Sequence, residues 1–82
     1  MIMVDVFVPA VGKSYDFNLD EEVKINMIIE EISEMIAHKE QTEIVGDVEK
    51  LLLCDKDSQR ILPSNQTLQD CMVSTGNKLI LV

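Results

Sequence analysis

Residues 25–39, INMIIEEISEMIAHK, decide the fold of this chain. Their apolar side chains recur at intervals of three and four positions, which places them on one side of a helix and leaves most of the acidic side chains on the other. These apolar residues are Ile25, Ile28, Ile29, Ile32, Met35 and Ile36. Acidic residues at 20–22 precede the stretch and Lys39 ends it, an order that the helix dipole favours. The pattern predicts one amphipathic helix with a single apolar stripe.

Segments on both sides of this helix are expected to form strands, and the two before it have the period of two that is typical of strands. In residues 2–8 this period places the aliphatic residues Ile2, Val4, Val6 and Val8 on one face, and in residues 14–19 it places Tyr15, Phe17 and Leu19 together. With the turn-forming residues 9–12 between them, the two runs predict an antiparallel hairpin. Three shorter strands are expected after the helix, at 50–54, 60–62 and 78–82. Residues 40–49 are expected to form a connection in which Ile44 and Val45 close one end of the core. The predicted order is β-β-α-β-β-β.

One helix with one apolar stripe can cover only one face of a sheet. We therefore expect a single α+β domain over residues 1–82, in which a mixed sheet of four to five strands packs on the helix. If the alternate residues of each strand point to the helix, then Phe7, Leu52 and Ile80 lie on the opposite, open face.

Composition excludes several classes of function. The formal net charge is −8, so the mean field of the chain repels phosphate, and we expect neither nucleic acid nor an anionic membrane as a partner. No apolar run approaches the roughly 20 residues of a membrane span, and no signal-peptide pattern is present. The two cysteines fit neither a disulfide framework nor a zinc site, and they indicate a reducing, cytoplasmic location.

The sequence offers little for catalysis. His38 falls on the polar side of the predicted helix, and neither Cys54 nor Cys71 has basic neighbours in sequence that would activate a thiol. Glu30 and Glu34 lie one turn apart on an exposed helix face, without a cleft. No phosphate-binding glycine loop, metal-ligand spacing or Ser-His-Asp arrangement is visible. We therefore expect no enzyme activity, no cofactor and no bound metal.

The C-terminal stretch 67–81, TLQDCMVSTGNKLIL, resembles a known family. A Thr-Leu-x-Asp sequence, a small turn, an aliphatic residue and a final strand are similar to the ubiquitin-like pattern. The stretch resembles more closely the YukD/EsaB family, the small ubiquitin-like accessory proteins of bacterial type VII secretion, and the length and element order of the whole chain fit. Two positions depart from the family pattern, because Met72 stands where glycine is usual and Asn77 where aspartate is usual. Asparagine tolerates a left-handed backbone, whereas Met72 needs either an ordinary conformation or some strain.

The resemblance implies a ubiquitin-like β-grasp fold and a role as a non-catalytic adaptor or regulator of type VII secretion. The implied partners are cytoplasmic domains of the membrane-embedded secretion machinery, which would recruit the protein to the inner face of the membrane. Conjugation by ubiquitin requires a flexible C-terminal Gly-Gly, whereas residues 79–82 here, LILV, are predicted to be the last strand itself. The alternatives are a sulfur carrier or modifier that has lost its Gly-Gly tail, and a ubiquitin-like domain of a larger membrane transporter component.

Ubiquitin-like domains commonly bind partners through the open sheet face. By resemblance, Leu52, Ile80, Val82 and the hairpin residue Val11 would form such a patch, and Phe7 joins it by strand alternation. A homodimer is a further arrangement that this face or an exposed strand edge allows.

Overall fold

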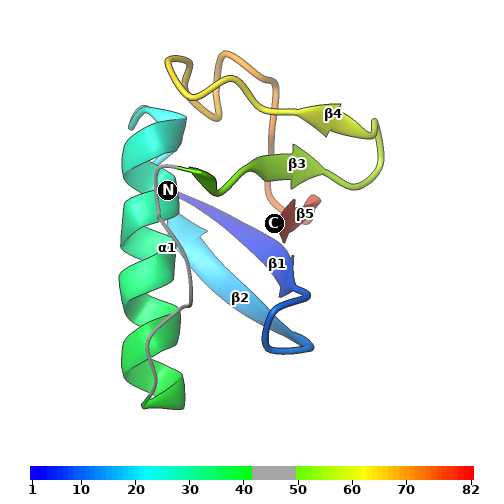
Figure 1. Ribbon diagram of the computed structural model, residues 1–82. Coiled ribbons are helices and arrows are strands. Elements are labelled where there is room, and N and C mark those ends of the chain that lie inside the picture. Colours follow the sequence, from blue (N-terminus) through cyan, green and yellow to red (C-terminus); the bar gives the residue numbers. More distant parts are fainter. Residues whose placement is uncertain (42–49) are drawn as a thin grey trace.

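A computed structural model describes residues 1–41 and 50–82, and the predicted role of Ile44 and Val45 lies outside these residues. The described chain forms five strands and one helix, in the predicted order. They are β1 (Ile2–Val8), β2 (Lys13–Leu19), α1 (Ile25–Glu40), β3 (Leu53–Asp55), β4 (Arg60–Ile61) and β5 (Lys78–Leu81). Figure 1 shows α1 beside the sheet formed by the strands.

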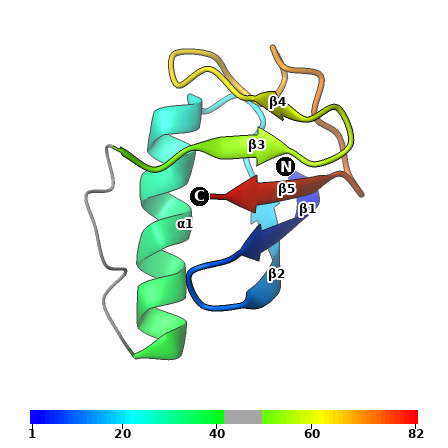
Figure 2. The same ribbon diagram turned by 45° about the vertical axis from the view of Figure 1, so that its right-hand side comes forward.

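The five strands form one mixed sheet in the order β2-β1-β5-β3-β4. β1 and β2 pair as the antiparallel hairpin, while β1 and β5, the two central partners, run parallel. β3 pairs antiparallel with both β5 and β4. The chain therefore brings its last strand into the middle of the sheet, next to its first (Figure 2).

The core fills the space between α1 and one face of the sheet. Its helix contribution is Ile25, Ile28, Ile29, Ile32 and Ile36, each at most 5% exposed. Alternate strand residues contribute Val4, Val6, Val8, Tyr15, Phe17, Leu19, Leu53, Leu79 and Leu81, and residues outside the strands add Leu62, Leu68, Cys71 and Val73. The predicted amphipathic stripe and the predicted inward set of these strands are thus confirmed, although Met35 remains 37% exposed.

The N-terminus of α1 is capped by backbone carbonyls. Lys24 occupies the N-cap position and makes no side-chain capping hydrogen bond, and the first turn contains no acidic residue. Instead, the amide of Ile25 donates to the carbonyl of Gln66 at 2.7 Å, and that of Asn26 donates to the carbonyl of Ser64 at 3.1 Å. The 64–66 loop thereby satisfies donors that the start of a helix leaves open.

The C-terminal end of α1 is tied to β2 by polar contacts. The hydroxyl of Tyr15 donates to the Glu40 carboxylate, and the ammonium of Lys13 lies 3.1 Å from the same carboxylate. Hydrogen bonding from Tyr15, followed by that from Lys13, lowers the pKa of Glu40. The same bond, with burial, raises the pKa of Tyr15 to about 12.

The family-like motif at residues 67–70 closes a turn and supplies a core residue. The Thr67 amide donates to the Asp70 carboxylate at 3.1 Å, and the Asp70 amide donates to the Thr67 hydroxyl at 3.0 Å. This reciprocal pair has the geometry of a capping box. Leu68, between them, is fully buried. The motif therefore stabilises the fold.

The two departures from the family pattern have different structural consequences. Met72 has a φ of 61°, in the left-handed region, and its side chain is 87% exposed, so it holds the conformation that glycine would adopt there without strain. Asn77 does not adopt a positive φ; Gly76 before it does, at 92°. The Asn77 side-chain oxygen instead accepts a hydrogen bond from the Ser74 amide at 2.8 Å, which an aspartate oxygen could also do.

The three strands after the helix differ from their predicted bounds, the last of them only in that β5 ends at Leu81 rather than at 82. The run predicted at 50–54 becomes a strand at Leu53–Asp55, although Leu52 still exchanges two backbone hydrogen bonds with Val82, at 2.6 and 2.9 Å. β4 ends at Ile61 rather than at 62, because Pro63 follows and Leu62 turns into the core. These differences arise because the extent of a short strand depends on the partners with which it pairs.

Candidate protein-binding face

The face of the sheet opposite α1 is not covered by a helix in the described part of the chain (Figures 1 and 2). Strand register places one row of side chains across this face. Phe7 of β1 is paired with Ile80 of β5, Ile80 with Cys54 of β3, and Cys54 with Ile61 of β4. Directly paired residues have neighbouring side chains on the same face of a sheet. Four strands thus contribute one continuous apolar row.

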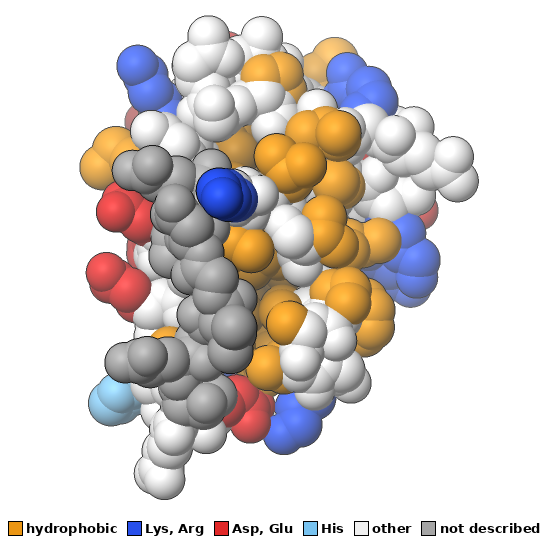
Figure 3. Space-filling model, viewed as in Figure 1, with side chains coloured by type: hydrophobic (Ala, Val, Ile, Leu, Met, Phe, Trp, Pro, Cys, Tyr) orange, Lys and Arg blue, Asp and Glu red, His pale blue; other side chains and the backbone are white. Residues whose placement is uncertain are grey.

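A second apolar pair adjoins this row. Leu52 and Val82, which exchange backbone hydrogen bonds, each lie two residues from a member of the row and point to the same face. Together, the open-face patch consists of Phe7, Leu52, Cys54, Ile61, Ile80 and Val82. Phe7, Leu52, Ile61 and Val82 are 40–59% exposed, whereas Ile80 and Cys54 are half-buried. Figure 3 shows hydrophobic side chains gathered in a band over the strands, with Lys and Arg at its border.

Four of the five residues predicted for a binding surface are brought together here: Phe7, Leu52, Ile80 and Val82. Val11 differs, because it lies in the hairpin turn, is half-buried and packs against the core. Ile61 and Cys54 were not predicted. The sequence gives little indication of which face Ile61 occupies, since β4 has only two residues and no alternation can be read from so short a strand.

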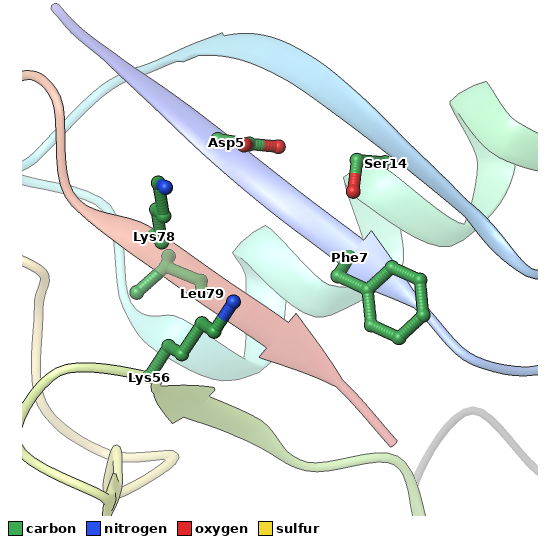
Figure 4. A pocket seen from close by; sticks show the side chains of 6 residues that line it. All are labelled: Asp5, Phe7, Ser14, Lys56, Lys78 and Leu79. Carbon is green, nitrogen blue, oxygen red and sulfur yellow. The ribbon is translucent and has the colours of Figure 1, made fainter.

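A hollow of about 330 Å³ lies next to the patch on the same face. Asp5, Phe7, Ser14, Lys56, Lys78 and Leu79 line it, and Figure 4 shows their side chains with α1 behind the strands. In the described chain, no hydrogen bond joins any two of these side chains. The hollow therefore combines an aromatic ring with charged groups but does not assemble a nucleophile and a base.

The residues considered for catalysis lie apart from this face or lack activating groups. His38 is exposed near the C-terminal end of α1. Cys71 is buried, and this burial raises the pKa of its thiol, which favours the unreactive form. Within residues 1–41 and 50–82, no group of three or more His, Cys, Asp or Glu side chains is placed to hold a metal ion. None of the described helices has both the length and the apolar character that a bilayer span requires.

Solved structures of ubiquitin-like domains share this fold. The N-terminal ubiquitin-like domain of the 4931431F19Rik protein superposes with a TM-score of 0.76 at 20% identity, covering 99% of this chain and 72% of that one. The UBL domain of Plasmodium falciparum Dsk2 gives a TM-score of 0.75 at 21% identity, covering 99% and 95%. A designed protein based on ubiquitin gives 0.74 at 16%, covering 99% and 85%. The fold is therefore a ubiquitin-like β-grasp, as predicted.

Sequence comparison adds the family. Among curated proteins, none matches the chain. The family model described as WXG100 protein secretion system (Wss), protein YukD, matches residues 2–81, which is nearly the whole chain. The family predicted from residues 67–81 is thus confirmed, and with it the association with type VII secretion. The chain belongs to the YukD family of the WXG100 protein secretion system.

Proposed function

We propose that this protein is a non-catalytic, non-conjugated adaptor or regulator of the WXG100 secretion system that acts by binding other proteins through the open-face patch. Its partners are cytoplasmic domains of the membrane-embedded secretion machinery. The protein resides in the cytoplasm and reaches the inner face of the membrane through such a partner. A net charge of −8 disfavours binding to nucleic acid or to an anionic lipid surface.

The observation that carries this proposal is the continuity of the patch. Isolated exposed apolar side chains are ordinary on protein surfaces, whereas a contiguous set indicates an interaction site. Here the row from Phe7 to Ile61 crosses four adjacent strands without a polar interruption, and Leu52 and Val82 extend it. An extended apolar row of this kind suits a protein partner better than a small substrate, which requires a deep, mostly apolar concave site.

The competing function is that of a sulfur carrier or modifier with a Gly-Gly tail. In such a protein the residues that enter the activating enzyme must be free of the sheet. Residues 78–81 form β5, and Val82 both donates to and accepts from Leu52. These residues are therefore held in the sheet and cannot themselves serve as such a tail.

The test is a pull-down from cytoplasm and solubilised membrane of the source cells. Wild-type protein is compared with a Leu52→Asp, Ile80→Asp double variant, which places two carboxylates in the patch. Met27→Asp is the matched control, because Met27 is 56% exposed on α1, away from the patch. Far-UV circular dichroism and urea unfolding establish that all three proteins fold.

Recovery of secretion-machinery components by wild type and Met27→Asp, but not by the double variant, is the expected result. Equal recovery by all three proteins would move the binding site to another face. Recovery of an adenylating enzyme would instead favour the modifier.

A further inference from the structure

A row of charged side chains runs parallel to the apolar row on the open face. Asp16 of β2 is paired with Asp5 of β1, and Asp5 is paired with Lys78 of β5. Lys56, which follows β3, donates its amide to the carbonyl of Lys78 at 2.9 Å and so extends the row. All four residues have the same strand parity as the open-face patch. The row therefore reads acid, acid, base, base across the sheet.

These charges are not neutralised within the described chain. The two ion pairs that the described residues form involve Met1 with Glu21 and Lys13 with Glu40, and neither includes a member of the row. Figure 4 shows Asp5, Lys56 and Lys78 projecting from the strands on the side away from α1. The two acidic residues thus lie on β2 and β1, and the two basic residues lie on β5 and directly after the end of β3, next to β5.

Such a row is complementary to a reversed copy of itself. An isologous dimer places the same surface of each copy against the other, related by a two-fold axis. An axis parallel to the strands, between β1 and β5, places β1 of each copy over β5 of the other. Acid then faces base at each of the four positions, and the apolar rows lie over each other, with Phe7 opposite Ile80.

We propose that the open sheet face binds a second copy of this chain in that arrangement, with Asp5 opposite Lys78 and Asp16 opposite Lys56 of the other copy. The apolar rows supply the buried centre of the interface and the charged row supplies its register. A two-fold axis across the strands, along the apolar row, would leave both charged rows unpaired. The dimer covers the same patch that the proposed function assigns to the secretion machinery, so the two complexes exclude each other.

The test is sedimentation equilibrium of the purified full chain up to about 1 mM protein at about 0.15 M salt. Asp5→Lys and Lys78→Glu are each expected to raise the dimer dissociation constant about tenfold or more, because each places like charges opposite one another. An equimolar mixture of the two variants is expected to form a heterodimer, since both opposing pairs are then restored. The pair Asp16→Lys and Lys56→Glu repeats the test at two exposed positions outside the core.

The two single variants also separate local pairing from net charge. Lys78→Glu makes the chain more acidic and Asp5→Lys makes it less acidic, so general repulsion predicts opposite effects, whereas the proposed register predicts that both weaken the dimer. A wild-type protein that stays monomeric would overturn the dimer and leave the patch to the secretion partner. A dimer that neither substitution weakens, or two weakened variants that do not recover on mixing, would also overturn it. Because no other protein is present, these results do not depend on the pull-down.

Discussion

Replacing Met72 with glycine is expected to stabilise the fold. Met72 has a φ of 61°, and a left-handed conformation costs a residue with a Cβ atom roughly 1–2 kcal/mol. Glycine avoids this cost but loses more backbone entropy on folding, by roughly 0.5–1 kcal/mol. The side chain is 87% exposed, so its removal sacrifices little packing. The free energy of unfolding should therefore rise by about 0.5–1 kcal/mol, and Tm by about 2–8 °C.

Urea unfolding at neutral pH, followed by circular dichroism, measures this change. Met72→Ala is the matched control, because it removes the same side chain but retains the Cβ atom, and it should stay within about 0.5 kcal/mol of wild type. Met72→Asn should fall between alanine and glycine, since asparagine tolerates positive φ. If glycine and alanine gave the same stability, or if glycine lowered it, the backbone at Met72 would not store the strain inferred from its φ.

Three further substitutions test the contacts that hold the fold. Thr67→Ala removes the hydroxyl that accepts a hydrogen bond from the Asp70 amide, and it should lower the free energy of unfolding, measured in urea, by about 1 kcal/mol. Gln69→Ala is the control, because Gln69 is exposed in the same turn, and it should change that free energy by less than about 0.5 kcal/mol. Leu68→Ala truncates a fully buried side chain and should lower the unfolding free energy by about 2–5 kcal/mol, measured in the same way; a loss below about 1 kcal/mol would contradict its place in the core. Tyr15→Phe should lower the urea midpoint of unfolding at pH 7, because it removes the hydrogen bond to the Glu40 carboxylate. Folding lowers the pKa of Glu40, so the stability that this carboxylate contributes is lost as it becomes protonated. The difference in midpoint between variant and wild type should therefore shrink as the pH falls below 4.5, the ordinary pKa of this carboxyl. A deficit that is constant down to acid pH would show that the Tyr15–Glu40 bond does not contribute.

The elements that could be predicted from sequence are those with enough residues to display a period. The helix predicted at 25–39 and the hairpin strands each repeat their pattern over at least six residues, and their faces follow from it. The outward positions of Phe7 and Ile80 follow from the same rule. The outward position of Leu52 could also be predicted, because its neighbours Leu51 and Leu53 turn to the core.

The remaining features depend on partners that are distant in sequence. Ile61 joins the patch because β4 pairs with β3 in a register that sets it beside Cys54, and a two-residue strand does not reveal its face. Lys56 follows β3 in a turn-like stretch, yet its backbone bond to Lys78 places it in the charged row. Similarly, the carbonyls of Ser64 and Gln66 cap α1 from a segment almost 40 residues away. Local sequence patterns do not encode such pairings.

The proposal that the open-face patch performs the function is tested most directly by secretion itself. Cells that produce the Leu52→Asp, Ile80→Asp variant in place of wild type would be assayed for WXG100 substrate in the culture medium, beside cells that produce Met27→Asp. With equal intracellular levels of all three proteins, we expect the double variant to lose export to the level of a deletion strain, and Met27→Asp to export normally. Normal export by the double variant would contradict a function that resides in this face.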